Sequence, residues 1–335
     1  MAGLLLRRLV FTLFVLWSVT LITFLLSRAM PGDPARLIAG PRANQEAVQH
    51  IRQQYGLDRP LATQYARYLG DLFRGDLGMS FVTRRPVRTD IAAFFPATIE
   101  LGVSALMFGS AIGLAVGVAA AVRRGSAADL AGRFAATAGM SMPAFWLAML
   151  SQLVLYSRLR WLPFGGRLST GQPSPPQVTG LFTVDSLLAG QVWTFRDAVT
   201  HLILPATTLG LGVMGVMARI VRTSVLEVLG EDYIRTARAK GLAPHRVLSR
   251  YTLRNALLPA VTVTGLQFGL LAGGVFLVET VFAWPGIGRY AYDAIRASDY
   301  NAIMGVTLLV ALAYAVVNLL VDLAYLVVDP RVRYT

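Results

Sequence analysis

Apolar runs long enough to cross a lipid bilayer are the feature that most constrains this chain. A helix needs roughly 20 mostly apolar residues to cross the hydrocarbon of a membrane. A helix of a water-soluble domain shows one polar face, whereas these runs are apolar all round. An all-α membrane protein with six transmembrane helices is therefore predicted, with spans at residues 9–29, 98–122, 134–156, 201–217, 259–282 and 302–328.

Composition excludes several other classes of protein. Hydrophobic residues make up 55% of the chain and charged residues only 15%. The formal net charge of +13 lies in the gaps between apolar runs, whereas nucleic-acid binders gather positive charge on one solvated face. Without cysteine, and with three scattered histidines, the chain offers no disulfide framework and no plausible metal-ligand cluster. We therefore expect no nucleic-acid partner, no metal and no cofactor of its own.

The distribution of arginine predicts the orientation in the membrane. An even number of spans places both termini on one side, and cytoplasmic loops carry an excess of Lys and Arg. The short segments on the side of the termini hold Arg7, Arg8, Arg123, Arg124, Arg133, the cluster at 219–254, Arg331 and Arg333. The termini are therefore predicted to be cytoplasmic. The first apolar run resembles a signal peptide but exceeds the usual 7–15 apolar residues, so it is interpreted as an uncleaved first span.

The segments between the spans suggest three regions. Residues 1–30 form the N-terminus and first span, residues 31–96 an extracytoplasmic helical loop, and residues 97–335 a five-helix core with a cytoplasmic loop at 223–258. Helices are expected at 44–55 and 60–74. The external loop at 162–197 is rich in Pro, Gly, Ser and Thr, and it is expected to be irregular and mobile.

Catalytic and nucleotide-binding motifs are absent or misplaced. Gly210, Gly212 and Gly215 have the spacing of a dinucleotide fingerprint but lie inside a span, without the strand that such a motif requires. The only lysine, Lys240, is not part of a phosphate-binding loop. Ionisable groups inside the spans are few, with Glu279 and Asp322 near span ends. A membrane enzyme is thus disfavoured. An ion-coupled secondary transporter remains the alternative, and any ATP would have to bind another chain.

Two rows of glycine are expected to pack helices. Glycines four residues apart share one helix face and allow close approach of a neighbouring helix in the membrane. One row is Gly109, Gly113 and Gly117, and the other is Gly265, Gly269 and Gly273.

A basic stretch after the fourth span, "EDYIRTARAKGLAPHRVLSRYTLRNALLP", is predicted to form two helices joined by a glycine turn. Ser224 and Glu227 have capping-box spacing, which predicts a helix start there. Gly241 suits a helix C-terminus, and Pro244 suits the first turn of a second helix. A lipid-surface helix, a charge that only fixes topology and a disordered loop are the alternatives. Small residues between the charges favour insertion into a groove of another protein.

At these residues the chain resembles the permeases of binding-protein-dependent ABC importers, in the dipeptide, oligopeptide and nickel branch. The resemblance is carried by "DYIRTARAKGL", in which Gly241 takes the place of the glycine of the EAA loop, and by "PGDPA", "YGLDRPLATQY", "GDLGMS", "PATIELG", "SMPAFWLAM", "HLILPATTLGLG", "LRNALLP", "VETVFAWPGIGR" and "VDLAYLVVDPR". These segments occur in order along nearly the whole chain.

The resemblance implies a type I importer permease with cytoplasmic coupling helices in the bacterial inner membrane. It implies a second permease, two cytoplasmic ATPase subunits that hold ATP and magnesium, and an extracytoplasmic substrate-binding protein that delivers peptides or similar solutes. The segment implied to contact the ATPase consists of Arg235, Thr236, Ala237, Arg238, Ala239, Lys240, Gly241 and Leu242.

Overall fold

The structure is a computed structural model of the 335-residue chain, and it describes all residues except 1, 30–33, 41–42, 55 and 329–335. Within the described residues the regular elements are helices, and the only β-type pairing recorded is an isolated bridge between Met79 and Pro86. The chain divides into two compact units, one of residues 1–95 with 290–315 and the other of residues 96–289 with 316–335. Each unit is described by itself.

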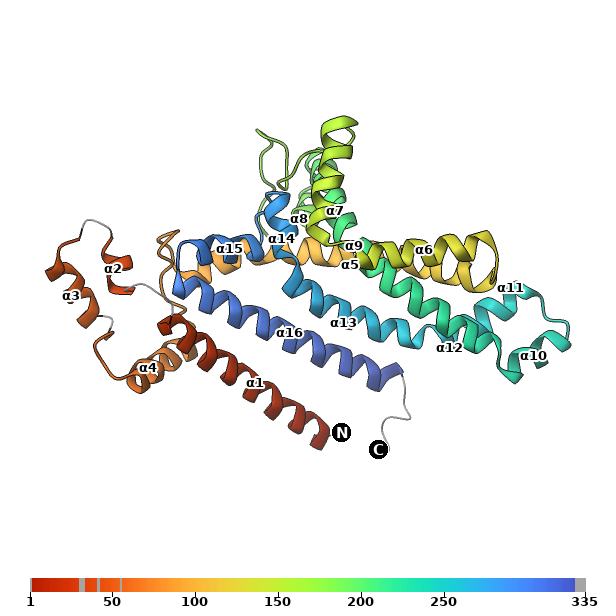
Figure 1. Ribbon diagram of the computed structural model, residues 1–335, viewed down its shortest axis with the longest axis horizontal. Coiled ribbons are helices and arrows are strands. Elements are labelled where there is room, and N and C mark those ends of the chain that lie inside the picture. Colours follow the sequence, from red (N-terminus) through yellow and green to blue (C-terminus); the bar gives the residue numbers. More distant parts are fainter. Residues whose placement is uncertain (1, 30–33, 41–42, 55, 329–335) are drawn as a thin grey trace. The chain divides into compact units, whose positions relative to one another are not determined.

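The first unit pairs the end of a long apolar helix with an amphipathic one. Helix α1 (Ala2–Ala29) is followed by α2 (Pro34–Ala39), α3 (Gln45–Gln54) and α4 (Leu61–Phe73) (Figure 1). The helices expected at 44–55 and 60–74 are thereby confirmed. The ring of Phe24 on α1 lies 5.3 Å from Tyr65 and 6.0 Å from Tyr68 of α4. The hydroxyls of Thr20 and Tyr65 are also hydrogen-bonded at 2.9 Å, so aromatic packing holds α4 to the end of α1.

The turn-rich segment after α4 is fixed by a buried carboxylate. Asp299 accepts hydrogen bonds from the Ser80 hydroxyl at 2.6 Å and from the amides of Phe81 at 2.7 Å and Val82 at 3.1 Å. It lies just before α16 (Tyr300–Val328) and just after α15 (Ile287–Arg296). Gly78 has a φ of +79°, a left-handed conformation that favours glycine, and an added Cβ would lie 2.9 Å from the Asn301 side-chain nitrogen.

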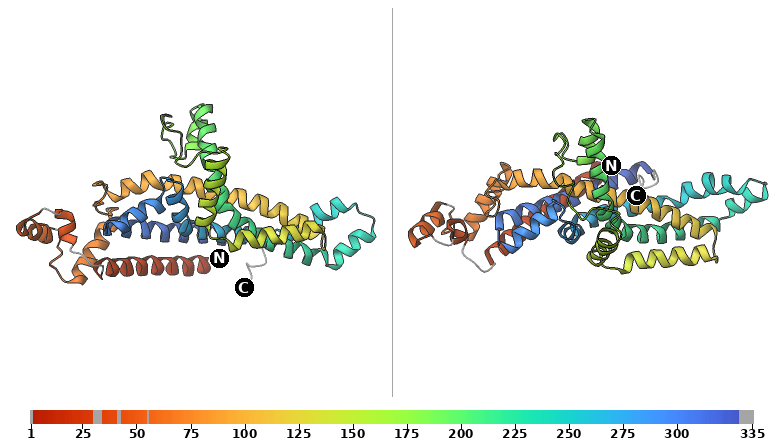
Figure 2. Two further views of the ribbon diagram at one scale, coloured as in Figure 1. Left: turned by 45° about the horizontal axis from the view of Figure 1, so that its top comes forward. Right: turned by 90° about the horizontal axis from the view of Figure 1, so that it is seen from above.

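The second unit is built around the longest helix, α9 (Val192–Leu229). The helix α5 (Val87–Val122) packs against α9 through its glycine row: a Cβ added to Gly109, Gly113 or Gly117 would lie 2.5 to 2.7 Å from the nearest α9 atom, which for Gly109 is the carbonyl oxygen of Gly210. Helix α6 (Ala127–Ser141) also runs beside α9 (Figure 2). Only close-packed backbones explain these distances. Gly265, Gly269 and Gly273 lie on α13 (Leu258–Gly274); their packing role stays a prediction, and the surroundings of Gly273 lie outside the described side chains.

The third predicted span is sharply bent. It consists of α6, α7 (Ala144–Ser151) and the π-helical η1 (Gln152–Arg158), with an angle of 104° at the break. Pro143 lies at this break, where its ring and missing N–H interrupt the helical hydrogen-bond ladder. Pro143 therefore accounts for the bend.

The described residues contain four helices long and apolar enough to cross a membrane, or five if the bent pair is one span. The fourth predicted span is the centre of α9, which extends well beyond it at both ends. The fifth is divided into α13 and the short α14 (Phe276–Val281), which begins after Val275. The six-helix count is therefore not confirmed, although the helical membrane architecture is.

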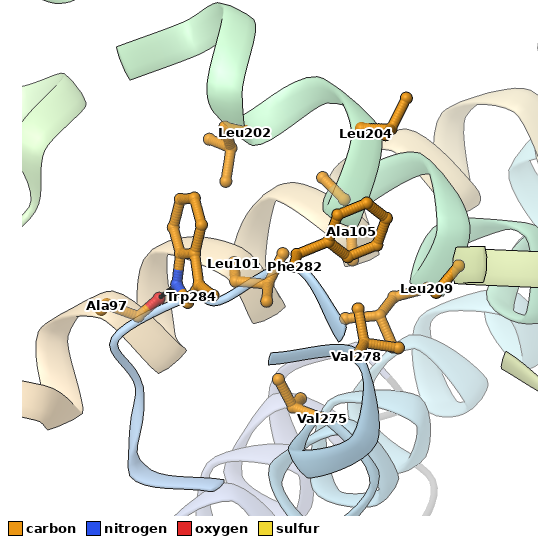
Figure 3. Packing of buried hydrophobic residues seen from close by; sticks show 12 residues of the cluster. Ala97, Leu101, Ala105, Leu202, Leu204, Leu209, Val275, Val278, Phe282 and Trp284 are labelled. Carbon is orange, nitrogen blue, oxygen red and sulfur yellow. Dashed lines mark hydrogen bonds between the residues drawn. The ribbon is translucent and has the colours of Figure 1, made fainter. Parts of the chain in front are cut away.

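A hydrophobic core joins α5, α9 and α14 within the second unit (Figure 3). Phe282 and Trp284 are fully or almost fully buried among Leu101, Leu204 and Val278. The indole N–H of Trp284 donates to the backbone oxygen of Ala97 at 2.9 Å, which pairs the polar edge of a buried aromatic residue.

The loop at 162–197 is irregular only in part: residues 162–181 lack regular helix, as predicted, whereas α8 (Phe182–Leu188) and the first residues of α9 lie within the same stretch. Arg167 is buried, donates to Glu100 at 2.6 Å and lies 3.5 Å from the Phe182 ring centroid. Asp185 on α8 (Phe182–Leu188) accepts bonds from the Thr179 hydroxyl and from three successive backbone amides. These contacts argue against the mobility expected for this loop. Breaking a buried ion pair such as Arg167–Glu100 by removing one partner costs about 3–5 kcal/mol.

Candidate functional site: the segment that follows α9

The segment after α9 folds into a short helical platform at the C-terminal end of that helix (Figures 1 and 2). Helix α10 (Asp232–Ala239) is followed by α11 (Pro244–Arg246), the π-helical η2 (Val247–Thr252) and α12 (Leu253–Ala256). The two-helix prediction is thus confirmed in outline, including the place of Pro244 in the first turn of the second helix. That second helix contains a π-helical stretch that the sequence did not indicate.

The predicted helix start at Ser224 is wrong. Ser224 is buried inside α9, which continues to Leu229, and α10 begins only after the extended residue Glu231. The apolar residues Val225, Leu226 and Val228 keep the α9 ladder going, because their packing outweighs the local capping signal.

The end of α10 forms a Schellman motif. Gly241 has a φ of +74°, the amide of Gly241 donates to the Arg238 oxygen at 2.9 Å, and the amide of Leu242 donates to the Ala237 oxygen at 3.3 Å. These two bonds satisfy carbonyls that would otherwise lack partners at a helix end. The side chain of Leu242 packs into the same cluster as Ala237, which is the apolar contact that accompanies this motif.

One face of α10 is anchored to the rest of the second unit. Ile234 is fully buried and Ala237 is 6% exposed, and they form a cluster with Val247 against which Val228 and Leu229 pack. Together these residues join α10, the end of α9 and η2 into a small apolar cluster.

A second contact ties α10 to α12. The Asn255 side-chain amide donates to the Tyr233 hydroxyl at 2.9 Å. The helix is therefore held on two sides by residues outside it.

The opposite face of α10 is exposed and mostly basic. Arg235, Thr236, Arg238, Ala239 and Lys240 are all exposed. Arg235 lies 3.3 Å from Asp232, a pair so solvated that it contributes little to stability. The face is thus free to contact another molecule, and its cations complement the carbonyl end of the helix dipole.

The eight predicted residues are adjacent in the structure, but they differ in exposure to solvent. Arg235, Thr236, Arg238, Ala239, Lys240 and Gly241 are exposed, whereas Ala237 and Leu242 turn toward the apolar cluster. Six of the eight are thus positioned for contact and two for anchoring.

Sequence reasoning missed an ion pair that joins α6 to α9. Asp129 accepts from Arg222 through both oxygens, at 2.7 and 3.0 Å, and also from the Gly125 amide at 3.0 Å. Ser126 caps α6 by accepting from the Asp129 amide at 3.4 Å. The spacing of Ser126 and Asp129 is a capping signal that the sequence does display.

A second missed site surrounds Glu279. This fully buried carboxylate accepts from the Thr98 hydroxyl at 2.6 Å and from the Arg289 amide at 3.0 Å. Gly286 leaves no room for a Cβ beside that carboxylate, and the Thr98 hydroxyl accepts from the Ile287 amide at 2.8 Å. The carboxylate organises the loop after α14. Because 181 residues separate Glu279 from Thr98, local sequence carries no signal of this pairing.

Among the residues that the structure describes, no group of three His, Cys, Asp or Glu side chains could hold a metal ion. The polar constellations described above are occupied by internal hydrogen bonds and ion pairs. The geometry is that of a membrane scaffold that carries an exposed helical contact element.

Comparison with known proteins agrees with this reading. Residues 113–334 match the family described as "Binding-protein-dependent transport system inner membrane component", and residues 1–102 match the N-terminal part of such membrane components.

Curated relatives extend over nearly the whole chain. The chain is 47% identical to a probable D,D-dipeptide transport system permease protein, DdpB, of Escherichia coli K12, covering 95% of this chain and 94% of that protein. It is 45% identical to the dipeptide permease DppB of the same strain and 41% identical to the glutathione permease GsiC of Salmonella paratyphi A, with 98% of each chain covered.

Among solved structures, the methionine ABC transporter MetNI in inward-facing conformations has a chain with a TM-score of 0.50 and 20% identity. That match covers 70% of this chain and 93% of the other, and it supports the fold alone. The chain belongs to the binding-protein-dependent transport system inner membrane components, and it is a multi-pass permease subunit of an ATP-driven importer rather than an enzyme or an ion-coupled transporter.

Proposed function

We propose that this permease carries peptides or similar small solutes, and that the eight residues from Arg235 to Leu242 receive the movement of a cytoplasmic ATPase. The proposed contact with the ATPase is supported by the two different faces of α10. Its buried face is fixed by Ile234 and Ala237, and its basic face is exposed.

Rigidity is what makes α10 suitable for transmitting force. A flexible loop would absorb displacement, whereas a helix with a closed C-terminus and a buried face moves as one piece. The apolar cluster with Val228 and Leu229 connects α10 directly to α9. A push on the basic face of α10 would thus be passed to the longest helix of the second unit.

The proposed assembly contains this chain, a second permease, two cytoplasmic ATPase subunits and an extracytoplasmic substrate-binding protein. The ATPases hold ATP and magnesium, because this chain has no phosphate-binding loop and its only lysine, Lys240, lies at the C-terminal cap of α10. The loops at 31–96 and 162–197 face the binding protein, and both termini face the cytoplasm. The relatives that transport dipeptides and glutathione favour a peptide-like solute.

Charge reversal at Arg238 tests the coupling role. Arg238 is exposed and makes no ion pair that the structure records, so Arg238→Glu should leave the fold and subunit assembly intact. We expect dipeptide uptake to fall about tenfold or more, since reversing a charge at an interface costs several kcal/mol.

The matched control is Arg250→Glu, an exposed arginine on η2 outside the eight residues. Uptake and ATP hydrolysis are measured in vesicles with the co-expressed subunits. Equal uptake by the Arg238 and Arg250 variants would refute the assignment of α10.

A further inference from the structure

The first unit contains a large cavity, separate from the eight residues proposed to contact the ATPase. Its volume is about 720 Å³. We call it the span-end cavity, and its lining includes Phe24, Arg28, Tyr68, Arg88, Tyr300 and Met304.

Three buried polar atoms in this lining have no hydrogen-bond partner among the residues that the structure describes. They are Arg28 Nε, Gln64 Oε1 and the Tyr300 hydroxyl. Tyr300 is only 2% exposed, so bulk water does not satisfy its hydroxyl. Buried polar groups are nearly always paired in folded proteins, and unpaired ones call for a partner from outside the chain. Two of these three atoms are hydrogen-bond donors, which fits a ligand rich in acceptor oxygens.

The lining also carries excess positive charge. Four arginines face two aspartates: Arg28, Arg67, Arg74 and Arg88 against Asp71 and Asp76. Asp76 already accepts from the Gly78 amide at 2.8 Å, and Asp71 lies 3.9 Å from Arg74. The net positive charge of the lining favours the binding of an anion.

A tyrosine in the wall remains a donor at all physiological pH values. Burial, with a smaller contribution from Tyr65, raises the pKa of Tyr68 to about 12. A protonated phenol can donate to an anionic oxygen but does not repel it.

The position of the cavity indicates the source of the anion. Phe24 and Arg28 lie in the last two turns of α1, and Tyr300 and Met304 lie at the start of α16. Both helices are apolar enough to span a membrane. The cavity is thus where the apolar spans end, at the level of lipid phosphates, and Arg and Tyr are typical of that level.

We propose that the span-end cavity binds the phosphate of a phospholipid head group, with Arg28 and the Tyr300 hydroxyl as donors to its oxygens. The lipid belongs to the outer leaflet, a detail that rests on the orientation in the proposed function. The aromatic walls and Met304 accommodate the glycerol and the first methylenes of the acyl chains. A charge-assisted bond from a guanidinium to phosphate is among the stronger polar contacts in proteins.

Native mass spectrometry of the full-length chain, purified with the subunits that accompany it, tests this site. Dioleoylphosphatidylglycerol is titrated into the lipid-depleted protein. Arg28→Gln should weaken binding about tenfold, because a charge-assisted bond is lost. Tyr300→Phe should weaken it about threefold, as expected for one neutral donor. Arg36→Gln, on the exposed face of α2, is the matched control and should bind like the parent protein.

Thermal unfolding gives a second readout. Removing an unpaired buried hydroxyl should leave the lipid-free Tyr300→Phe protein as stable as the parent or more so, while the lipid-induced gain in melting temperature shrinks. If Arg28→Gln fails to fold, the Tyr300→Phe variant alone tests whether the span-end cavity binds the lipid.

Unchanged lipid binding by the folded variants would overturn the proposal. So would displacement of the lipid by millimolar alanyl-alanine, because that outcome would assign the cavity to a solute carboxylate. Neither result depends on ATP hydrolysis or uptake, so the lipid site and the transport role can fail separately.

Discussion

The left-handed residue at the end of α10 gives a quantitative test of the rigid-helix model. Gly241 has a φ of +74°, and a Cβ at this position would meet no atom within 4 Å. Steric clash with neighbours is thus absent, and substitution costs only the backbone penalty of a left-handed residue. That penalty is about 1–2 kcal/mol for an ordinary L-residue and smaller for asparagine.

We therefore expect Gly241→Val to open the helix end far more often than Gly241→Asn. A change of 1–2 kcal/mol corresponds to about a 5- to 30-fold change in an equilibrium. The amides that report it are those of residue 241 and Leu242, which donate to Arg238 and Ala237. In Gly241→Val their hydrogen exchange should accelerate by about that factor.

Ala239→Gly is the matched control. Ala239 is exposed on the same helix, and glycine there costs about 0.5–1 kcal/mol through chain entropy without requiring a left-handed backbone. Peptide uptake should be highest in Gly241→Asn, lower in Gly241→Ala and lowest in Gly241→Val. Equal exchange and equal uptake for Gly241→Asn and Gly241→Val would refute the reasoning, because a constrained αL residue must discriminate between them.

Two other features give direct expectations. Gly113→Val on α5 should destabilise the packing with α9, because its Cβ would lie 2.7 Å from the Met217 Cβ. Gly102→Val on the same helix should be tolerated, because a Cβ there meets nothing within 4 Å. The melting temperatures of the two variants in detergent test this difference. Burial alone would raise the pKa of Asp185, but hydrogen bonds from Thr179 and neighbouring amides hold it below its ordinary value. The stabilisation that Asp185 gives the loop at 162–197 is therefore complete above the ordinary pKa of a carboxyl group and is lost as the pH falls through the lowered value. Limited proteolysis of that loop should accelerate in acid for the parent protein and be rapid at neutral pH for Asp185→Asn; a parent loop resistant at every pH would contradict this.

The helical membrane class and several helix ends were predictable because their signals are local. The apolar runs, the φ > 0 requirement at Gly241 and the break at Pro143 depend on residues within one or two turns. Such local rules are the ones that single sequences display well.

The features missed by sequence depend on distant partners. The bond from Thr98 to Glu279 joins residues 181 positions apart, and Arg167 reaches Glu100 across 67 positions. The predicted helix start at Ser224 was wrong for the opposite reason. A local capping pattern is present there, but the continuing apolar face of α9 overrides it.

Site-directed crosslinking tests directly whether α10 contacts an ATPase subunit. The chain contains no cysteine, so Arg238→Cys introduces a single thiol on the exposed face of α10. Ser174→Cys, on an exposed part of the loop at 162–197, is the control, because that loop is proposed to lie on the opposite side of the membrane. With co-expressed ATPase subunits and a short bifunctional reagent, we expect a crosslinked product from Arg238→Cys and none from Ser174→Cys. Equal products from both positions, or a product from Ser174→Cys alone, would contradict this expectation.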